Sequence, residues 1–280
     1  MENITSSRLA TLGHPQRLSI FRLLMRRYPD RLPAGEIAGL LDLKPSTLSA
    51  YLAALMQAGL VNQKRSGTSL RYSVALETVR ETFDYLLLDC CRGRPDICAT
   101  LAPSQSEPAP MSDRMFTVLF LCTGNSARSI FAEAILRDTA GDRFLVFSAG
   151  TKPRSELNPF AVEVLAAKGH DITRLRAKNA TEFHGSDAPK MDFVFTVCDH
   201  AANEDCPPWP GQPVSAHWGM PDPVKAEGSD AQKSLAFQQA YGSLANRIAA
   251  FTALPIASLD RLSLQKAMDG IGRMNVEDPA

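Results

Sequence analysis

The chain has 280 residues, with 30 basic and 30 acidic side chains, so its formal net charge is zero. Hydrophobic residues make up 45% of it, which is typical of a globular protein, and the length suits two ordinary domains. The longest apolar runs, residues 115–122 and 192–198, fall far short of the roughly 20 residues of a membrane span. The N-terminus also lacks the apolar core of a signal peptide, so we expect a cytoplasmic protein with no membrane partner.

The zero net charge hides a division of the chain. Residues 1–100 carry a net charge of +4 and residues 101–280 carry −4, so the basic front part permits a polyanionic partner. Residues 102–113 read APSQSEPAPMSD and keep no hydrophobic period, as in a linker. We therefore predict a first domain over 1–101, a linker over 102–114, a second domain over 115–255 and a C-terminal tail over 256–280.

The first domain is predicted to be mainly α-helical, with a winged helix-turn-helix. Hydrophobic residues recur at helical spacing over 8–27, 33–41 and 77–91, and a further helix starts near Ser46 and ends at Gly59. Two strand-like runs flank residues 66–68, which is a hairpin signal. In such a fold the second helix of the pair enters the major groove and the hairpin contacts phosphates. The candidate DNA-binding residues are Ser46, Thr47, Ser49 and Tyr51 on the helix, and Lys64, Arg65 and Arg71 on the hairpin. A small helical domain with a solvated basic hairpin is the alternative.

Three segments of the first domain make this prediction more specific. LGHPQRLSIFRLL, EIAGLLDLKPSTLSAYLAALMQAGLV and RSGTSLRYSV resemble the ArsR/SmtB family of metal- and metalloid-responsive repressors, over about residues 5–98. The resemblance implies a homodimer, paired through its first and last helices, that binds operator DNA and leaves it when metal binds.

Three cysteines, Cys90, Cys91 and Cys98, lie within nine residues at the end of this domain. Soft thiolates select thiophilic ions, and three sulfurs suit a trigonal As(III) or Sb(III) site, whereas zinc prefers four ligands. Neighbouring residues of an α-helix point about 100° apart, so Cys90 and Cys91 cannot bind one atom from an undisturbed helix. We hypothesise that As(III) unwinds the last helical turn and so shifts the dimer interface. Three incidental cysteines are the alternative.

The second domain alternates strand-like and helix-like segments. The predicted strands are 117–122, 144–148, 193–198 and 214–218, and the predicted helices are 129–139, 159–168 and 231–254. This alternation predicts an α/β domain with a four-stranded parallel sheet.

The segment FLCTGNSARS places Cys122 at the end of the first of these strands and Arg128 at the start of a helix. Backbone N–H groups, the helix N-terminus and the two-pronged guanidinium can together hold a tetrahedral oxyanion. The candidate oxyanion-binding residues are Thr123, Gly124, Asn125, Ser126, Ala127 and Arg128. The same field predicts a lowered pKa for the Cys122 thiol, with Ser129 hydrogen-bonded to the sulfur. A chance match to the spacing is the alternative.

Further segments extend this pattern over about residues 116–255. VLFLCTGNSARS, FSAGT, NPFAVEVLAAKGHDI, DFVFTVCDHAANEDCPPWPG and AHWGMPDP resemble the low-molecular-weight tyrosine phosphatase superfamily and, within it, the arsenate reductases. The resemblance implies that the Cys122 thiolate attacks the oxyanion and that Asp222, followed by Pro223, is the general acid for the leaving oxygen. An ordinary turn residue is the alternative for Asp222.

Two more cysteines distinguish a reductase from a phosphatase. By the logic of the family, Cys198 forms a disulfide with Cys122, Cys206 then takes over Cys198, and an external reductant clears the final disulfide. The resemblance implies thioredoxin, glutaredoxin with glutathione, or another small thiol as this reductant. A structural role for both cysteines is the alternative.

The combined prediction is an arsenic-responsive transcriptional repressor fused to an arsenate reductase, with no tightly bound cofactor. Glu133 and Ser148 fall where some reductases place potassium, so potassium is a candidate ligand there. Two alternatives stay open at this point. One is a metalloid-responsive regulator fused to a protein tyrosine phosphatase, and the other is a pure DNA-binding sensor whose second domain is an inactive oxyanion-binding module.

Overall fold

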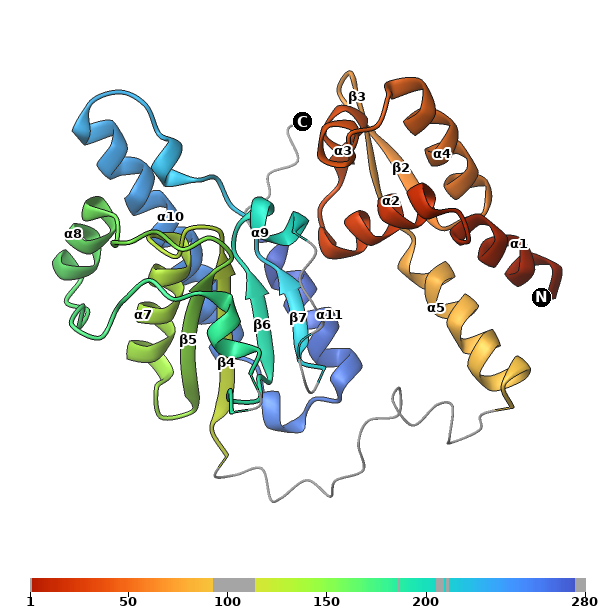
Figure 1. The fold of residues 1–280 in the computed structure, drawn as a ribbon. Coiled ribbons are helices and arrows are strands. Elements are labelled where there is room, and N and C mark those ends of the chain that lie inside the picture. Colours follow the sequence, from red (N-terminus) through yellow and green to blue (C-terminus); the bar gives the residue numbers. More distant parts are fainter. Residues whose placement is uncertain (1, 93–113, 186, 205–208, 210–211, 275–280) are drawn as a thin grey trace. The chain divides into compact units, whose positions relative to one another are not determined.

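The computed structural model describes residues 2–92, 114–185, 187–204, 209 and 212–274 (Figure 1). These residues form two compact units, the first ending at residue 92 and the second beginning at residue 114, and each has its own hydrophobic core. Arg114 is the one described residue of the predicted linker, and Cys98 and Cys206 lie outside the described residues. No helix in the described ranges is long and apolar enough to cross a membrane.

The first unit opens with two helices, α1 (Glu2–Leu12) and α2 (Pro15–Arg26), where the sequence predicted one. The break has a local cause. Pro15 disfavours helical geometry in the residue before it, and His14 accordingly has φ −91° and ψ 125°. The His14 ring accepts a hydrogen bond from the Gln16 N–H at 3.3 Å, so it caps the second helix.

The helix-turn-helix consists of α3 (Ala34–Leu41) and α4 (Pro45–Gln57). Asp42, with φ 50°, ends α3 in the left-handed conformation, and its N–H bonds back to Ala38. Helix α4 starts at Pro45 rather than near Ser46, since proline suits the first helical position. A short strand β1 (Leu32–Pro33) pairs with the hairpin of β2 (Val61–Ser66) and β3 (Ser69–Val74), and these strands make an antiparallel sheet in the order β1-β3-β2.

The last helix of the first unit changes its geometry near its end. Helix α5 (Leu76–Asp84) continues as a π-helical turn, η1 (Tyr85–Cys90), in which the Cys91 N–H donates to the Leu86 carbonyl at 2.9 Å. A π-turn of this kind is wider than an α-helical turn and is often found at functional sites. The prediction of a regular helix to Cys91 is therefore wrong in its last turn.

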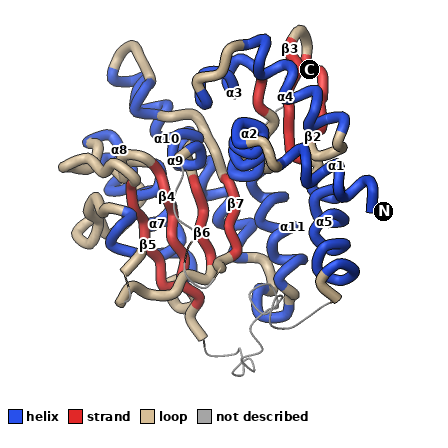
Figure 2. The backbone as a smooth tube through the Cα atoms, turned by 45° about the vertical axis from the view of Figure 1, so that its right-hand side comes forward, coloured by secondary structure: helices blue, strands red, loops and turns tan. Residues whose placement is uncertain are grey.

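The second unit contains the predicted four-stranded parallel sheet, which confirms the α/β prediction. Strands β4 (Phe116–Cys122), β5 (Phe144–Gly150), β6 (Phe193–Thr196) and β7 (Val214–His217) lie in the order β5-β4-β6-β7 (Figure 2). The register pairs Cys122 with Gly150 and Leu121 with Thr196. The carboxyl ends of three strands therefore meet around Cys122.

Alternate residues of β4 supply two cores, because successive side chains of a strand point to opposite faces. Val118, Phe120 and Cys122 join the large cluster that includes residues of α7 (Arg128–Ala140), α8 (Pro159–Ala167) and α10 (Asp230–Thr252). Leu119 and Leu121 join a smaller cluster that includes residues of the 3-10 turn η2 (Ala180–Phe183).

The segment predicted as a C-terminal tail belongs to the second unit, which corrects the predicted boundary. After the turn η4 (Ile256–Ser258), helix α11 (Arg261–Gly272) packs along β7, and its Met268 and Ile271 are buried in the large cluster. The indole N–H of Trp218 donates to the Met268 carbonyl at 3.1 Å. The segment is helical because its apolar residues recur at helical spacing and Asp260 caps its first turn.

Candidate active site at the end of strand β4

The loop between β4 and α7 is held from outside by the loop that follows β5. The carbonyls of residues 122, 123, 124 and 126 accept hydrogen bonds from the N–H groups of residues 151, 152, 154 and 158, at 2.9–3.1 Å. These carbonyls therefore face away from the centre of the loop. Asn125 has φ 43°, the left-handed conformation that asparagine tolerates, and its N–H donates to the Cys122 sulfur at 3.1 Å. A loop built in this way presents donors, which is what an oxyanion requires.

The Cys122 sulfur is almost fully buried and lies 2.9 Å from the Ser129 hydroxyl oxygen. Burial raises the pKa of the Cys122 thiol above its ordinary value, and the neighbouring Cys198 acts in the same direction. The Ser129 hydroxyl, Arg128 and the Asn125 N–H lower the pKa but do not outweigh burial. The predicted lowered pKa is therefore wrong for this structure, because the sequence showed the charged groups but not the loss of water.

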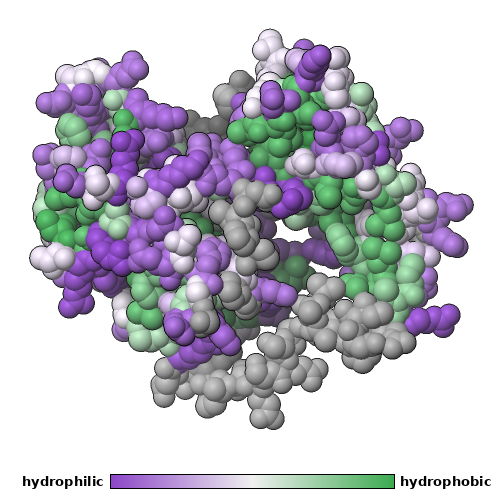
Figure 3. All heavy atoms as spheres, in the orientation of Figure 1, coloured by the Kyte–Doolittle hydropathy of each residue, from purple (hydrophilic) through white to green (hydrophobic). Residues whose placement is uncertain are grey.

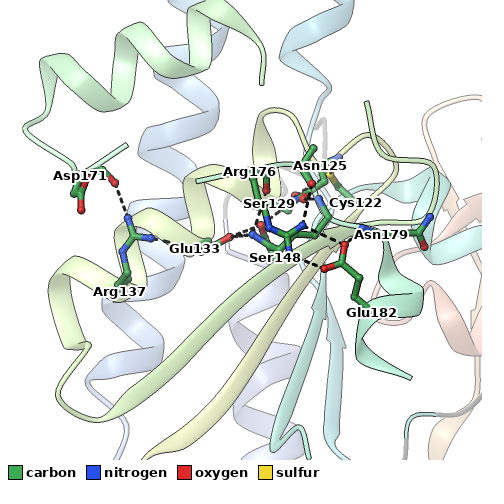
Figure 4. Close-up of polar contacts among 12 residues, drawn as sticks. Cys122, Asn125, Ser129, Glu133, Arg137, Ser148, Asp171, Arg176, Asn179 and Glu182 are labelled. Atoms are coloured by element: carbon green, nitrogen blue, oxygen red, sulfur yellow. Dashed lines mark hydrogen bonds and ion pairs between the residues drawn. The ribbon is translucent and has the colours of Figure 1, made fainter. Parts of the chain in front are cut away.

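A buried polar network lies behind the loop (Figure 4). The Asn125 amide nitrogen donates to Ser129 Oγ at 2.9 Å and to Ser148 Oγ at 2.8 Å. Ser148 donates in turn to Glu133 Oε2, which also accepts from Lys178 Nζ at 2.9 Å. All five residues are at most 6% exposed. Lys178 was not predicted as a site residue, because it lies in an irregular segment with no motif around it.

Arg128 and Asp222 are brought together at the mouth of the loop. Arg128 Nη2 lies 2.8 Å from Asp222 Oδ2, and Nη1 donates to the Met220 carbonyl at 3.2 Å. The second Asp222 oxygen accepts from the Val224 N–H at 3.2 Å, so Asp222 caps the turn η3 (Pro223–Lys225). The carboxylate thus holds the guanidinium beside Cys122, where an oxyanion would compete for the same donors.

Cys198 follows strand β6 and lies next to the loop. Its sulfur is 3.4 Å from the Thr123 hydroxyl oxygen and accepts from the Ala201 N–H at the start of the short helix α9 (Asp199–Asn203). The side chain is buried, and its sulfur contacts Thr123, the residue next to Cys122, so the two thiols lie close to each other. Both are free thiols. Cys206, the third member of the predicted relay, lies outside the described residues.

The model of the family described as low molecular weight phosphotyrosine protein phosphatase matches residues 117–263, more than half of the chain. The chain belongs to this family. Its curated relatives include the arsenate reductase of Halalkalibacterium halodurans, which is 37% identical over 134 residues, 48% of this chain and 93% of that protein. The arsenate reductase of Bacillus licheniformis is 38% identical over 136 residues, 48% of this chain and 94% of that protein.

Among solved structures, an arsenate reductase in the phosphate-binding state is 25% identical, with a TM-score of 0.40, and the match covers 50% of this chain and 98% of that chain. In the first unit, a helix-turn-helix domain model matches residues 12–64. The chain therefore joins a helix-turn-helix domain to a low molecular weight phosphatase domain whose curated relatives include arsenate reductases, as the sequence predicted.

The candidate DNA-binding residues of α4 differ in their exposure and in whether they donate hydrogen bonds within the first unit. Ser46 is exposed near the start of α4, and Thr47 is half-buried. Ser49 donates to the Pro45 carbonyl at 2.9 Å, and Tyr51 donates to Gln16 Oε1 at 2.6 Å. These two hydroxyl protons are therefore engaged within the unit.

The three basic residues of the hairpin do not share one face. Lys64 and Arg71 are cross-strand partners in β2 and β3, so their side chains share a face of the sheet. Arg65 is adjacent to Lys64 along β2 and points to the other face. Its guanidinium donates to the Gly67 carbonyl at 3.1 Å.

The two described cysteines of the predicted metalloid site lie at the end of η1, with Cys90 as its last residue and Cys91 directly after it. Cys90 is exposed and Cys91 is half-buried, and both are free thiols. Arg92 follows in the left-handed conformation, with φ 54°. The chain thus leaves helical geometry immediately after the cysteine pair. The predicted third ligand, Cys98, lies outside the described residues.

Proposed function

We propose that this chain is an arsenic-responsive transcriptional regulator joined to an arsenate reductase that converts arsenate to arsenite. The observation that carries the proposal is the pair of neighbouring buried thiols, Cys122 and Cys198, at the mouth of an oxyanion-binding loop. A phosphatase reaction needs only the first thiol, whereas reduction needs a second thiol that forms a disulfide with the first. Two curated relatives that this chain matches over 93% and 94% of their length are arsenate reductases.

In the first step, the Cys122 thiolate attacks the arsenic of arsenate in the loop, forming a sulfur–arsenic bond. One arsenic–oxygen bond, to a hydroxyl group of hydrogen arsenate, breaks, and that hydroxyl takes a proton from Asp222 and leaves as water. Arg128 and the loop N–H groups hold the remaining oxygens. Asp222 Oδ2 lies 2.8 Å from Arg128 Nη2, so the proposed general acid is beside the guanidinium that would bind the oxyanion.

In the second step, the Cys198 thiolate attacks the Cys122 sulfur. A sulfur–sulfur bond forms, the sulfur–arsenic bond breaks, and its electron pair stays on arsenic, which leaves as arsenite. Two thiols are thereby oxidised and As(V) becomes As(III). Cys206 then attacks Cys198 and releases the Cys122 thiolate. A dithiol reductant, thioredoxin or glutaredoxin with glutathione, reduces the Cys198–Cys206 disulfide.

The first unit would bind operator DNA through α4 and the β2–β3 hairpin, as a homodimer. Dimerisation through α1 and through α5 with its continuation η1 is supported by exposed hydrophobic side chains on these elements, namely Ile4, Leu9, Phe83 and Leu88. Figure 3 shows hydrophobic residues gathered over α5. Cys90, Cys91 and Cys98 would bind the arsenite that the second unit produces, since three thiolates suit a thiophilic ion. The effector would then release the dimer from DNA.

The decisive test is arsenite production from arsenate by the purified chain with thioredoxin, thioredoxin reductase and NADPH. We expect three substitutions to lower turnover by more than about 100-fold each, namely Cys122→Ser, Cys198→Ser and Cys206→Ser. Each of them removes one thiol of the proposed disulfide relay. Cys91→Ser is the matched control, since it removes a thiol from the first unit and should leave turnover unchanged. Full turnover by Cys198→Ser would contradict the disulfide relay through Cys198. No arsenite production by the wild-type chain, with thioredoxin or with glutaredoxin and glutathione, would contradict the reductase proposal.

A phosphatase is the second candidate, because the matching family is described by that activity and the same loop and acid serve both reactions. Hydrolysis of p-nitrophenyl phosphate needs Cys122 but neither Cys198 nor Cys206. Hydrolysis that survives both substitutions, without arsenate turnover, would favour the phosphatase. Absence of both activities would favour a sensor whose second unit only binds an oxyanion.

A further inference from the structure

Glu133, on α7, is a buried carboxylate behind the oxyanion loop, and it is paired with a cation of the chain itself. Lys178 Nζ lies 2.9 Å from Glu133 Oε2, and both side chains are less than 10% exposed. Lys178 Nζ also donates to the Arg176 carbonyl at 3.2 Å. The other Glu133 oxygen lies 3.8 Å from Arg137 Nη1, which is a looser pair. A buried carboxylate needs such a partner, because it has lost its water.

We propose that the Lys178 ammonium is a built-in cation that takes the place of potassium at Glu133 and Ser148. If Lys178 replaces potassium, arsenate turnover should not depend on potassium. That expectation rests on the reductase reaction proposed above. The residues present do not fit a second cation. Glu133 Oε2 already accepts from Lys178 Nζ and from the Ser148 hydroxyl, and Asn125 Oδ1 accepts from the Lys178 N–H at 2.7 Å. A potassium ion at this carboxylate would place two positive charges side by side in a buried site.

Lys178 also fixes the direction of the hydrogen bonds that reach the nucleophile. A backbone N–H can only donate, so the Lys178 N–H requires Asn125 to turn its oxygen toward it. The Asn125 NH₂ group must then donate to Ser129 and Ser148. Ser129 accepts from Asn125, so its own proton is directed at the Cys122 sulfur 2.9 Å away. The backbone N–H of residue 178 thus orients these hydrogen bonds through Asn125, and any residue other than proline would supply it.

The side chain of Lys178 adds an electrostatic effect to this geometric one. With Lys178 ionised, the buried pair with Glu133 has no net charge. Without the ammonium, Glu133 would leave a buried negative charge behind the loop, and like charges disfavour a thiolate. Loss of the ammonium should therefore lower the thiolate fraction of Cys122. It should also destabilise the second unit, because the looser contact with Arg137 would be left as the ion pair of a buried carboxylate.

The experiment measures two properties that need no arsenate. The first is the rate at which iodoacetamide alkylates Cys122, measured by mass spectrometry of the peptide that contains Cys122. The second is the melting temperature of the second unit. Each is measured in KCl, NaCl and tetramethylammonium chloride at equal ionic strength. The wild-type chain should give the same values in all three salts. A higher alkylation rate or melting temperature of the wild-type chain in KCl alone would overturn the proposal, and this arm needs no variant.

Lys178→Ala removes the ammonium and leaves space beside Glu133. We expect alkylation roughly ten-fold slower and a melting temperature lower by about 10 °C, with both partly restored by KCl more than by tetramethylammonium chloride. Lys152→Ala is the matched control, since its side chain is 73% exposed and near the same loop, and it should change neither value. An effect of Lys178→Ala no larger than that of Lys152→Ala would overturn the proposal. If Lys178→Ala does not fold, Lys178→Met with Glu133→Gln, a neutral pair, should fold and be insensitive to KCl.

These readouts separate the two proposals. Salt-independent alkylation together with absent arsenate turnover would leave the built-in cation standing and reject the reductase. Turnover that requires potassium, in a chain that needs Cys122 and Cys198, would reject the built-in cation and leave the reductase standing.

Discussion

The Ser129 hydroxyl is the side-chain donor directed at the Cys122 sulfur, at 2.9 Å, within a site where burial raises the pKa of the thiol. A hydrogen bond to a charged group contributes roughly 1.5 kcal/mol, and 1.4 kcal/mol corresponds to a factor of ten in the thiolate fraction. Ser129→Ala should therefore slow alkylation of Cys122 at pH 8 by roughly ten-fold. Ser155→Ala, in an exposed position of the neighbouring loop, is the control. An unchanged rate in Ser129→Ala would show that the hydroxyl does not stabilise the thiolate.

The raised pKa of Cys122 also sets how the unliganded chain depends on pH. The thiol stays protonated to a higher pH in the folded chain than in the unfolded chain, because the folded site is buried. Stability from the protonated thiol is fully present below the pKa of the unfolded thiol, about 8.5, and is lost as the pH rises through the folded value. Alkylation of Cys122 should accordingly keep rising above pH 9. An alkylation rate that levels off near pH 7 would instead mean that folding lowers the pKa of the Cys122 thiol.

Strand β5 supports the oxyanion loop through a residue without a side chain. A Cβ atom added at Gly150 would lie 2.6 Å from the Thr123 carbonyl oxygen and 3.1 Å from the Asn125 N. Both contacts are with backbone, so the loop itself would have to move. Gly150→Ala should destabilise the second unit by about 1–3 kcal/mol and slow Cys122 alkylation, measured by urea unfolding and mass spectrometry.

At Gly242, in the middle of α10, a glycine-to-alanine substitution should stabilise the second unit rather than destabilise it. A Cβ there would meet nothing within 4 Å. Alanine favours a helix over glycine by roughly 1 kcal/mol, so Gly242→Ala should stabilise the unit by up to that amount. Equal effects of the two substitutions would mean that Gly150 does not support the loop.

The elements differ in how much of them the sequence can predict. The Cys122 loop was predictable because its residues are adjacent in the chain, and a strand, a short loop and a helix follow one another there. The break at Pro15 was also local, and the restriction that proline places on His14 should have indicated it. Lys178 was not predictable, because its bond to Glu133 joins residues 45 positions apart, in a segment without periodicity. The burial of Cys122 and the packing of α11 on β7 likewise depend on tertiary contacts.

At the scale of the whole molecule, the proposed dimer makes a prediction about the exposed hydrophobic side chains of the first unit. Leu88 on η1 is 70% exposed, and Phe83 on the preceding helix is 49% exposed. Exposed apolar patches, rather than single residues, mark interaction sites. Leu88→Glu should weaken self-association at least ten-fold, because a central apolar side chain in an interface commonly contributes more than 1 kcal/mol. Leu235→Glu, 54% exposed in the second unit, is the matched control. Sedimentation that is equally unaffected by both substitutions would place the dimer interface elsewhere or exclude a dimer.

The fusion of the two units makes a prediction that neither unit makes alone. If the second unit produces the effector of the first, arsenate should release the chain from DNA only in the presence of a reductant and only when Cys122 is intact. Arsenite should release both the wild-type chain and Cys122→Ser, because it bypasses the reductase. Cys91→Ser should respond to neither compound, although it still turns over arsenate, since it lacks one thiolate of the proposed As(III) site. Fluorescence anisotropy of a labelled duplex from the region upstream of the coding sequence measures all three. Release of Cys122→Ser by arsenate would instead mean that the oxyanion itself is sensed, and retention of the wild-type chain in arsenite would reject As(III) as the effector.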